Sequence, residues 1–282
     1  MKIKLYDTPG DFLLDNADFL QEYEAATQLS IGNAAAHRDE PCRPDLLFGR
    51  FEQDGSASLL FSHTAPYNLL LHAIPGDPAA LSGTVLLAEY LLKEQVAIRG
   101  VNASKALCNA FFSAYCKPYR VAYGMDIMVL KELIEPPVVS GTARLATEAD
   151  LPLLTQWHQT FYREALNEEP PEDEPQRVRG FYEKQGLYVF ETPEGELVST
   201  AHTSSRELPH GMSVSGVYTP PEHRGHGYCQ NTVAALCRDS LNKGADYVTL
   251  FVDKKNPFSN HVYAKLGFEI LEENFDCRLE DA

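Results

Sequence analysis

The sequence has few of the features that would place a protein in a membrane, on a nucleic acid or around a metal ion. No apolar run is long enough to span a bilayer, because the longest, Val85 to Leu92, is interrupted by Glu89. Lysine and arginine total 24 against 40 aspartates and glutamates, and the formal charge of −16 argues against a broad nucleic-acid surface, which needs clustered basic residues. We therefore expect no membrane and no nucleic-acid partner.

The cysteines also lack a pattern: they form no C-x-x-C pair and no Cys/His spacing typical of a metal site. Nothing at the N-terminus resembles a signal peptide. We therefore expect free thiols in a reducing cytoplasm and no bound metal. The cysteines are Cys42, Cys108, Cys116, Cys229, Cys237 and Cys277.

The chain has enough apolar residues for packed cores: 44% of its 282 residues are hydrophobic, which suits one large domain or two of ordinary size. The strongest linker is Glu135-Pro136-Pro137 followed by Ser140-Gly141, because prolines and small polar residues break helices and strands. This predicts two domains, residues 1–135 and 141–282.

Hydrophobic spacing and turn residues predict a mixture of helices and strands in both halves. In the first half we expect strands at 3–6, 46–51, 58–62, 68–73, 96–101 and 125–130, and helices after Thr8-Pro9, at 79–93 and at 105–115. In the second half we expect strands at 142–146, 187–191, 197–203 and 247–252, and helices after Thr147 and at 178–184.

The stretch from Val214 to Leu241 has the most informative pattern. An apolar, β-branched run predicts a strand, Pro220 and Pro221 end it, and a basic loop with Gly225 and Gly227 follows. The next segment is a helix with one buried face, formed by Val233, Leu236, Cys237 and Leu241. A flexible loop before a helix leaves backbone N–H groups unpaired, so this place is suited to binding phosphate.

Two common phosphate-binding loops do not fit this stretch. A Walker loop needs Gly-Lys-Ser/Thr where Tyr228 and Cys229 stand, and a dinucleotide fingerprint needs three glycines where R-G-H-G-Y-C has two. An ordinary strand–loop–helix turn with an exposed Arg224 remains an alternative for this loop taken alone.

A second motif, N-P-F-S-N-H-V-Y-A-K-L-G-F, runs from Asn256 to Phe268. On a helix, Ser259, Val262 and Tyr263 share one face, and Gly267 stands where a left-handed glycine ends a helix. Together the two motifs resemble the GNAT superfamily of acyl-CoA-dependent N-acyltransferases. Its loop reads Arg or Gln, two residues, Gly, one residue, then Gly or Ala. Arg224 and Gly227 match this pattern, and Cys229 departs from it.

This resemblance covers residues 142–279 and implies how acetyl-CoA would bind. Its pantetheine arm would pair with the backbone of Val217, Tyr218 and Thr219, and its pyrophosphate would meet Arg224 and the loop N–H groups. Those N–H groups belong to Gly225, His226, Gly227, Tyr228 and Cys229, with Asn256 and Ser259 as further cofactor-binding residues. Tyr263 would protonate the leaving thiolate. The base is left open between Glu164, His202, Asp253 and a water relay.

The first half repeats the same order of elements without the chemistry. No arginine precedes a paired glycine between Gly76 and Gly83, and no tyrosine on the helix from Lys105 is followed by Gly-Phe. We interpret it as a degenerate copy. The predicted fold is therefore α+β (mixed α/β): tandem GNAT-like domains, each a splayed, mixed, mostly antiparallel sheet with helices on both faces.

The predicted function is N-acetylation of a primary amine by direct attack on acetyl-CoA. The alternative is an acyl-CoA-binding pseudoenzyme or an interaction or sensor protein. The acceptor is expected to be a small-molecule or peptide amine, and the protein a monomer or homodimer. The acidic, proline-rich run from Asn167 to Pro175 is interpreted as a solvated loop, with a mouth for a cationic substrate as the alternative.

Overall fold

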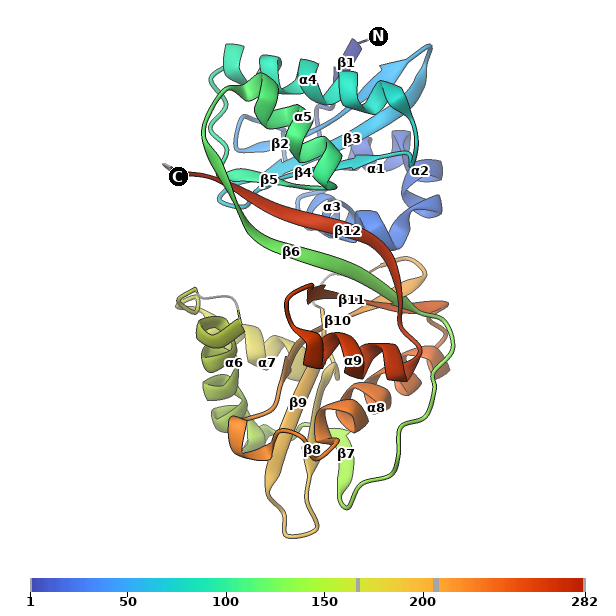
Figure 1. Cartoon of the computed structure of the whole chain (residues 1–282), viewed down its shortest axis with the longest axis vertical. Coiled ribbons are helices and arrows are strands. Elements are labelled where there is room, and N and C mark those ends of the chain that lie inside the picture. Colours follow the sequence, from blue (N-terminus) through green and yellow to red (C-terminus); the bar gives the residue numbers. More distant parts are fainter. Residues whose placement is uncertain (1, 166–167, 205–207, 281–282) are drawn as a thin grey trace. The chain divides into compact units, whose positions relative to one another are not determined.

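The computed structural model describes residues 2–165, 168–204 and 208–280. The chain divides into two compact units, which are each built from separate segments. Unit 1 contains Met1–Ile127, Val252–Lys255 and Ile270–Ala282, and unit 2 contains Met128–Phe251 and Asn256–Glu269. Figure 1 shows the elements of both units in the colours of the sequence.

The sheet of unit 1 is mostly antiparallel. Its order is β1 (Lys2–Leu5), β2 (Leu46–Gln53), β3 (Ser56–Thr64), β4 (Leu69–Ala73), β5 (Gly100–Ala103) and β12 (Glu269–Leu279). All neighbours in this series pair antiparallel except β4 and β5, which are parallel. The predicted meander of β2, β3 and β4 is confirmed, with the turn at Asp54-Gly55 joining its first two strands.

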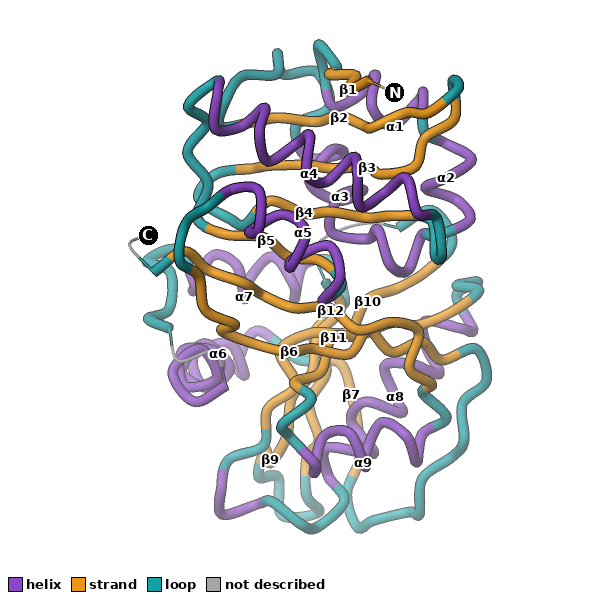
Figure 2. Tube along the Cα trace, turned by 45° about the horizontal axis from the view of Figure 1, so that its top comes forward, coloured by secondary structure: helices purple, strands orange, loops and turns teal. Residues whose placement is uncertain are grey.

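The helices of unit 1 cover both faces of this sheet. They are α1 (Pro9–Asp15), α2 (Ala17–Glu22), α3 (Glu24–Ala36), α4 (Pro78–Lys93) and α5 (Lys105–Tyr115). In Figure 2, α4 and α5 lie over one face and α1 to α3 over the other. The predicted Thr8-Pro9 start is confirmed, because the Thr8 hydroxyl accepts a hydrogen bond from Asp11 N at 3.1 Å and Pro9 opens the helix.

The last strand of the chain belongs to unit 1 rather than to the unit that precedes it in sequence. In β12, Phe275 pairs with Ala103 and Cys277 with Val101 of β5, and Cys277 and Leu279 are buried in the core of unit 1. The other long strand, β6 (Tyr119–Leu130), starts in unit 1 and ends in unit 2. The compact units thus combine chain segments from both sides of the linker. The division at residues 136–140 remains a prediction of where the two repeats join.

The sheet of unit 2 repeats the pairing pattern of unit 1. Its strands β7 (Thr142–Leu145), β8 (Leu187–Glu191), β9 (Leu197–Thr203) and β10 (Gly211–Tyr218) pair antiparallel in this order, and β10 pairs in parallel with β11 (Tyr247–Asp253). Each unit therefore has a run of antiparallel strands followed by one parallel neighbour. This arrangement confirms the predicted α+β class with mixed, mostly antiparallel sheets.

The helices of unit 2 are α6 (Leu151–Ala165), α7 (Glu174–Glu183), α8 (Tyr228–Asn242) and α9 (Pro257–Leu266), with short 3-10 turns at Glu148–Asp150 and Pro221–His223. Strand β8 alternates between two layers, because successive side chains of a strand point to opposite faces. Leu187 and Val189 pack with α6 and α7, whereas the Phe190 ring contacts Tyr228 at the start of α8. The capping box predicted at Thr147 is confirmed.

Two predicted elements need correction. The strand expected at 96–101 begins only at Gly100, and Val96 and Ile98 are buried without joining a ladder. The acidic run expected as a solvated loop contributes its last residues to α7, and Glu174 is almost completely buried. Asn167, where that run begins, lies outside the described residues.

Candidate functional site

Strand β10 has a backbone edge that its parallel neighbour leaves open. The ladder with β11 runs from Gly211 opposite Tyr247 to Val214 opposite Leu250, and among the described residues it continues no further. On its other side, the register with β9 shifts between Ser215 and Tyr218. The backbone from residue 215 to residue 218 can therefore pair with an extended ligand as it would with another strand.

The end of this strand is held by three side chains. Ser199 Oγ donates to Tyr218 O at 3.4 Å, and Thr219 Oγ1 donates to Ser199 Oγ at 2.9 Å. Arg224 Nε donates to Thr219 O at 2.9 Å, and the Arg224 guanidinium lies 6.0 Å from the centre of the Tyr218 ring. Tyr218 and Thr219 are thus fixed in place next to the loop that follows, and Val217 directly precedes them.

The loop between β10 and α8 depends on two glycines with left-handed backbone angles. Gly225 and Gly227 both have φ of +83°, and Gly227 is the N-cap of α8 with no side-chain hydrogen bond to the first turn. The N–H groups of a first helical turn have no acceptor within the helix. Since no side chain caps them here, they are available to an anionic ligand beside the positive end of the helix dipole.

The equivalent loop of unit 1 is closed by an acidic residue. Asp77 is the N-cap of α4, and its carboxylate accepts a hydrogen bond from Ala79 N at 2.8 Å. A carboxylate at this place satisfies the N–H groups and repels a phosphate. The difference between Asp77 and Gly227 gives a physical reason for interpreting the first half as a degenerate copy.

Helix α9 carries Tyr263 into the protein interior. Its side chain is buried, packs edge-on against Phe268 with ring centres 5.8 Å apart, and lies near the thiols of Cys229 and Cys237 on α8. Burial, followed by these two thiols, raises the pKa of Tyr263 well above its ordinary value. The phenol is protonated at neutral pH, as an unperturbed tyrosine also is, and the raised pKa makes it a weaker acid than a solvated tyrosine.

The ends of α9 match the sequence predictions. Asn256 is the N-cap, and its Oδ1 accepts from Ser259 N at 3.1 Å, so its side chain holds the helix start. Gly267 ends the helix with a left-handed φ of +98°. Cys229, in the first turn of α8, is in the environment of an unreactive thiol, because burial raises its pKa to about 12.

The three residues considered as a base have different surroundings. Glu164 Oε2 accepts from Arg224 Nη2 at 2.9 Å on the surface of unit 2. Asp253 belongs to the segment assigned to unit 1, and its Oδ1 accepts from Lys255 N. His202 is buried in β9, where its ring stacks on Phe181 with centres 3.8 Å apart.

Sequence reasoning missed a buried ion-pairing group in unit 2. His158 of α6 and Glu174 of α7 are 2% and 1% exposed, and His158 Nδ1 lies 3.1 Å from Glu174 Oε1. The available signal was spacing: His158 follows Leu151, Leu154 and Trp157 on the apolar face of α6. A histidine on such a face has to find a polar partner within the protein.

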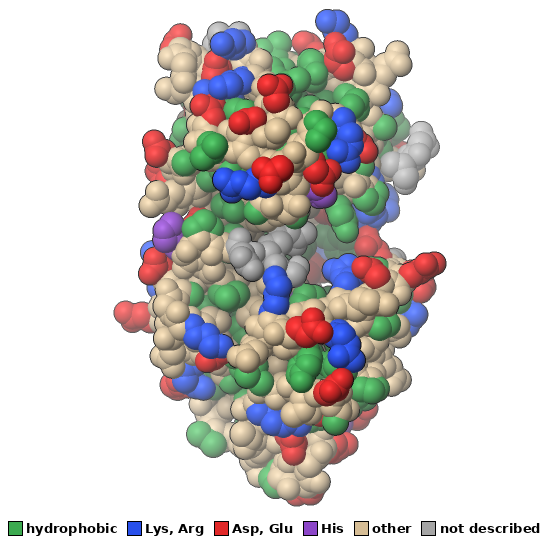
Figure 3. Space-filling view, turned by 180° about the vertical axis from the view of Figure 1, so that it is seen from behind, with side chains coloured by type: hydrophobic (Ala, Val, Ile, Leu, Met, Phe, Trp, Pro, Cys, Tyr) green, Lys and Arg blue, Asp and Glu red, His purple; other side chains and the backbone are tan. Residues whose placement is uncertain are grey.

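Charged side chains of both signs are mixed over the face of the molecule in Figure 3. Within the described ranges, no three or more His, Cys, Asp or Glu side chains are grouped so that they could hold a metal ion. In the same part of the chain, no helix combines the length and apolarity that crossing a bilayer requires.

Most of unit 2 matches a known protein family. Residues 151–268 match the acetyltransferase (GNAT) family model. The match contains β10, the glycine loop and α9 to Phe268. It confirms the resemblance inferred from the two motifs and supports acyl transfer as the general chemistry of this domain. No curated protein sequence gives a significant match to the chain.

Solved structures share the fold over nearly the whole chain. A GCN5-related N-acetyltransferase from Sphaerobacter thermophilus is 15% identical with a TM-score of 0.64, covering 98% of this chain and 94% of its own. A Drosophila protein is 12% identical with a TM-score of 0.67 and 98% coverage of both chains. A tandem GNAT protein from the clavulanic acid biosynthesis pathway is 14% identical with a TM-score of 0.55, covering 98% and 97%. The similarity in fold to these solved structures therefore extends over both halves of the chain.

Proposed function

We propose that this protein is an N-acetyltransferase that moves an acetyl group from acetyl-CoA to a primary amine. The observation that carries the proposal is the uncapped, glycine-led N-terminus of α8 directly after the open edge of β10. The family match supports acyl transfer, and the choice of acetyl-CoA, of an amine and of direct attack is our inference. The open edge suits a pantetheine arm, and the helix start suits a pyrophosphate.

In this proposal, each cofactor-binding residue acts through its backbone or through charge. Val217, Tyr218 and Thr219 offer backbone groups to the pantetheine amides, and residues 225–229 offer N–H groups to the pyrophosphate. Arg224 contributes positive charge after exchanging its contact with Glu164 for the phosphate oxygens. Asn256 supports the site by fixing the start of the helix that bears Tyr263, and Ser259 lies in the first turn that Asn256 caps.

The reaction needs one bond formed, one bond broken and two protons moved. The amine nitrogen attacks the thioester carbonyl, the C–N bond forms, and collapse of the tetrahedral intermediate breaks the C–S bond. A backbone N–H of β10 stabilises the oxyanion. The nitrogen gives up two protons in all. A base takes the first from the ammonium, and the second leaves the attacking nitrogen as the intermediate collapses, replacing the proton that Tyr263 gives to the CoA thiolate. Burial raises the pKa of Tyr263, so the phenol gives up its proton only to a strong base such as the developing thiolate.

We further propose a small-molecule or peptide amine as the acceptor, and a monomer or homodimer working in the cytoplasm. The chain has 40 acidic and 24 basic residues, and this excess of negative charge favours the approach of a cationic amine. All six cysteines are free thiols, which suits a reducing compartment.

The test combines binding and turnover. Acetyl-CoA should raise the melting temperature of the whole chain, since a ligand bound only by the folded state stabilises it. Incubation of the protein with acetyl-CoA and amine pools, followed by mass spectrometry, should then reveal an acetylated product. Binding without any product from a broad amine panel would favour the acyl-CoA-binding pseudoenzyme, and absence of a thermal shift at millimolar acetyl-CoA would refute the donor assignment.

A further inference from the structure

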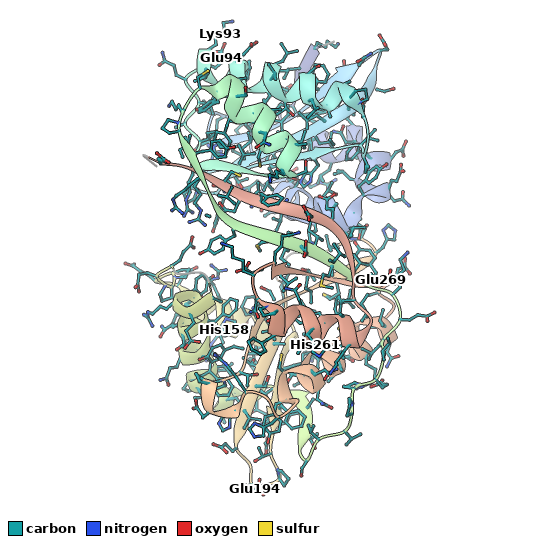
Figure 4. All side chains as sticks on the ribbon, in the orientation of Figure 1. Lys93, Glu94, His158, Glu194, His261 and Glu269 are labelled. Carbon is teal, nitrogen blue, oxygen red and sulfur yellow. The ribbon has the colours of Figure 1, made fainter. Side chains whose placement is uncertain are left out.

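The His158–Glu174 pair lies inside unit 2, where α6 packs against α7 and β10. Figure 4 labels His158 on α6. Its Nδ1 faces a carboxylate oxygen at 3.1 Å, and a carboxylate can only accept, so the neutral ring has its proton on Nδ1. The other nitrogen, Nε2, therefore presents a lone pair.

That lone pair has no hydrogen-bond partner within the described residues, and the far oxygen of Glu174 has none there either. His158 Nε2 is buried and makes no hydrogen bond there. A buried polar atom without a partner destabilises the folded state, because it has lost its hydrogen bonds to water. A water, an ion or a bound ligand can supply the missing hydrogen bond.

Gly216 brings this histidine to the backbone of β10. A Cβ at position 216 would lie 3.0 Å from His158 Cε1 and 2.3 Å from His202 Nε2. The two imidazoles therefore occupy the space that the side chain of any residue other than glycine would need. Gly216 also has a left-handed φ of +57°. It lies between Ser215 and Tyr218, within the open edge proposed for the acyl donor. The lone pair is thus held beside the strand along which the thioester would lie.

The neighbouring histidine is less suited to hold a proton. His202 Nδ1 lies 2.8 Å from Thr203 O, and burial, followed by the nearby His158, lowers its pKa to about 3. Within the described residues no carboxylate is paired with His202, whereas His158 has Glu174. An imidazolium at His158 would be stabilised by Glu174 and opposed by Arg177, whose Nε lies 3.7 Å from the far oxygen of Glu174.

We propose that His158 is the base of the transfer reaction and that Glu174 is its positioning residue. This inference rests on the proposed acetyltransferase function. The N–H bond of the acceptor ammonium breaks, a new N–H bond forms at His158 Nε2, directly or through one water, and Glu174 keeps the bond from Nδ1 and stabilises the imidazolium. The proton then leaves to solvent after product release, so the ring is neutral for the next turnover.

The first experiment compares two acceptor probes in the full-length protein: benzylamine, which is cationic at pH 7, and aniline, which is already uncharged. In His158→Gln, kcat/KM for benzylamine should fall ~10²–10⁴-fold, the range of general-base contributions, while aniline transfer and the acetyl-CoA thermal shift stay unchanged. Equal losses for both probes, or no loss for either, would overturn the assignment. His261→Gln, at an exposed histidine without a proposed role, controls for the loss of an imidazole.

The role of Glu174 has a separate readout. In Glu174→Gln, the acid limb of the pH profile with benzylamine should move to lower pH. The His158 ring faces Glu174 and Arg177 from α7 and His202 from β9. Of these three groups, the variant changes only the carboxylate. A lowered rate with an unmoved acid limb would show a packing role instead. If wild type acetylates neither probe, ¹⁵N spectra of the imidazoles decide the inference alone.

Those spectra do not depend on turnover. In its neutral form the His158 ring should have its proton on Nδ1 and a bare Nε2, and Glu174→Gln should make the second proton harder to add, because it removes the facing negative charge. A proton on Nε2, or a titration insensitive to Glu174, would overturn the inference. Absence of any acetyl-CoA thermal shift would refute the proposed function separately, so the two failures are distinguishable.

Discussion

Arg224 and Glu164 form an ion pair across the start of the glycine loop, with 2.9 Å between Nη2 and Oε2. The same guanidinium donates through Nε to Thr219 O, so one side chain links α6 to the end of β10. The two side chains are 53% and 43% exposed, and exposed pairs of this kind contribute ~0–1 kcal/mol to stability. A phosphate can therefore displace Glu164 at small cost.

Arg224→Ala should weaken acetyl-CoA binding while leaving the melting temperature of the free protein nearly unchanged. The pair is exposed, and the lost guanidinium matters only when phosphate is present. Differential scanning fluorimetry with and without acetyl-CoA measures both effects. The matched control is Arg179→Ala, which breaks an exposed pair with Glu148 at 3.4 Å in the same unit. Equal thermal shifts in wild type and Arg224→Ala would exclude the arginine from the phosphate site.

Gly225→Ala should reduce the acetyl-CoA thermal shift, because an L-residue is strained at φ of +83° and the loop would rearrange. Gly244→Ala is the control: it has φ of +100°, and at both positions a Cβ would meet nothing within 4 Å. Each variant should lose ~1–2 kcal/mol of stability from backbone strain. Only the variant at 225 should lose ligand binding, and parallel losses would show that the loop has no special role.

Tyr263→Phe should lower kcat ~10²–10⁴-fold with little change in KM for acetyl-CoA, since the phenol acts only as the thiolate develops. Tyr188→Phe serves as a control, because its hydroxyl bonds Asp239 near the C-terminal end of α8 and should affect stability alone. Steady-state kinetics on any acceptor found by the amine screen measures the effect. Wild-type turnover in Tyr263→Phe would leave the phenol with a packing role only.

His202→Gln should flatten the pH dependence of stability between pH 6.5 and 3. The pKa of His202 is lowered from 6.5 to about 3 by burial, so in this window the unfolded chain binds a proton that the folded chain does not. The stability owed to the neutral ring is complete above pH 6.5 and is lost as the pH falls toward 3. Urea midpoints at several pH values measure the slope.

His261→Gln, at an exposed position, should keep the wild-type slope. Should the His202 variant and wild type lose stability equally on acidification, protonation of His202 would not contribute to acid unfolding.

Sequence patterns predicted local elements well where one face of the element is buried and its ends have capping or turn residues. The bounds of β8, β9 and α5 agree with the expected ranges, and Gly267 ends α9 as its spacing indicated. Predictions were poorer where burial arises from distant contacts. Val96 and Ile98 are buried in the core although they belong to no strand. An apolar run in the sequence does not by itself distinguish a buried strand from a buried loop.

The site shows the same limit. Backbone features, such as the left-handed glycines at 225 and 227, follow from residue type and could be expected from the sequence. The pairing of His158 with Glu174 could not, because the two lie on different helices and the run around Glu174 is rich in acidic residues and proline, as exposed loops are. Only packing of α7 on α6 removes that carboxylate from solvent.

The position of β12 changes what a cut in this chain would do. Cleavage in the Pro-rich segment at 136–140 would separate the polypeptide into two pieces, yet the second piece would still supply the strand that pairs with β5 in unit 1. A nicked protein should therefore remain one particle on a sizing column and dissociate only in denaturant. Removal of the residues after Phe268, by contrast, would keep every proposed donor-binding residue but take β12 away from β5, so the change would destabilise unit 1, which holds none of those residues.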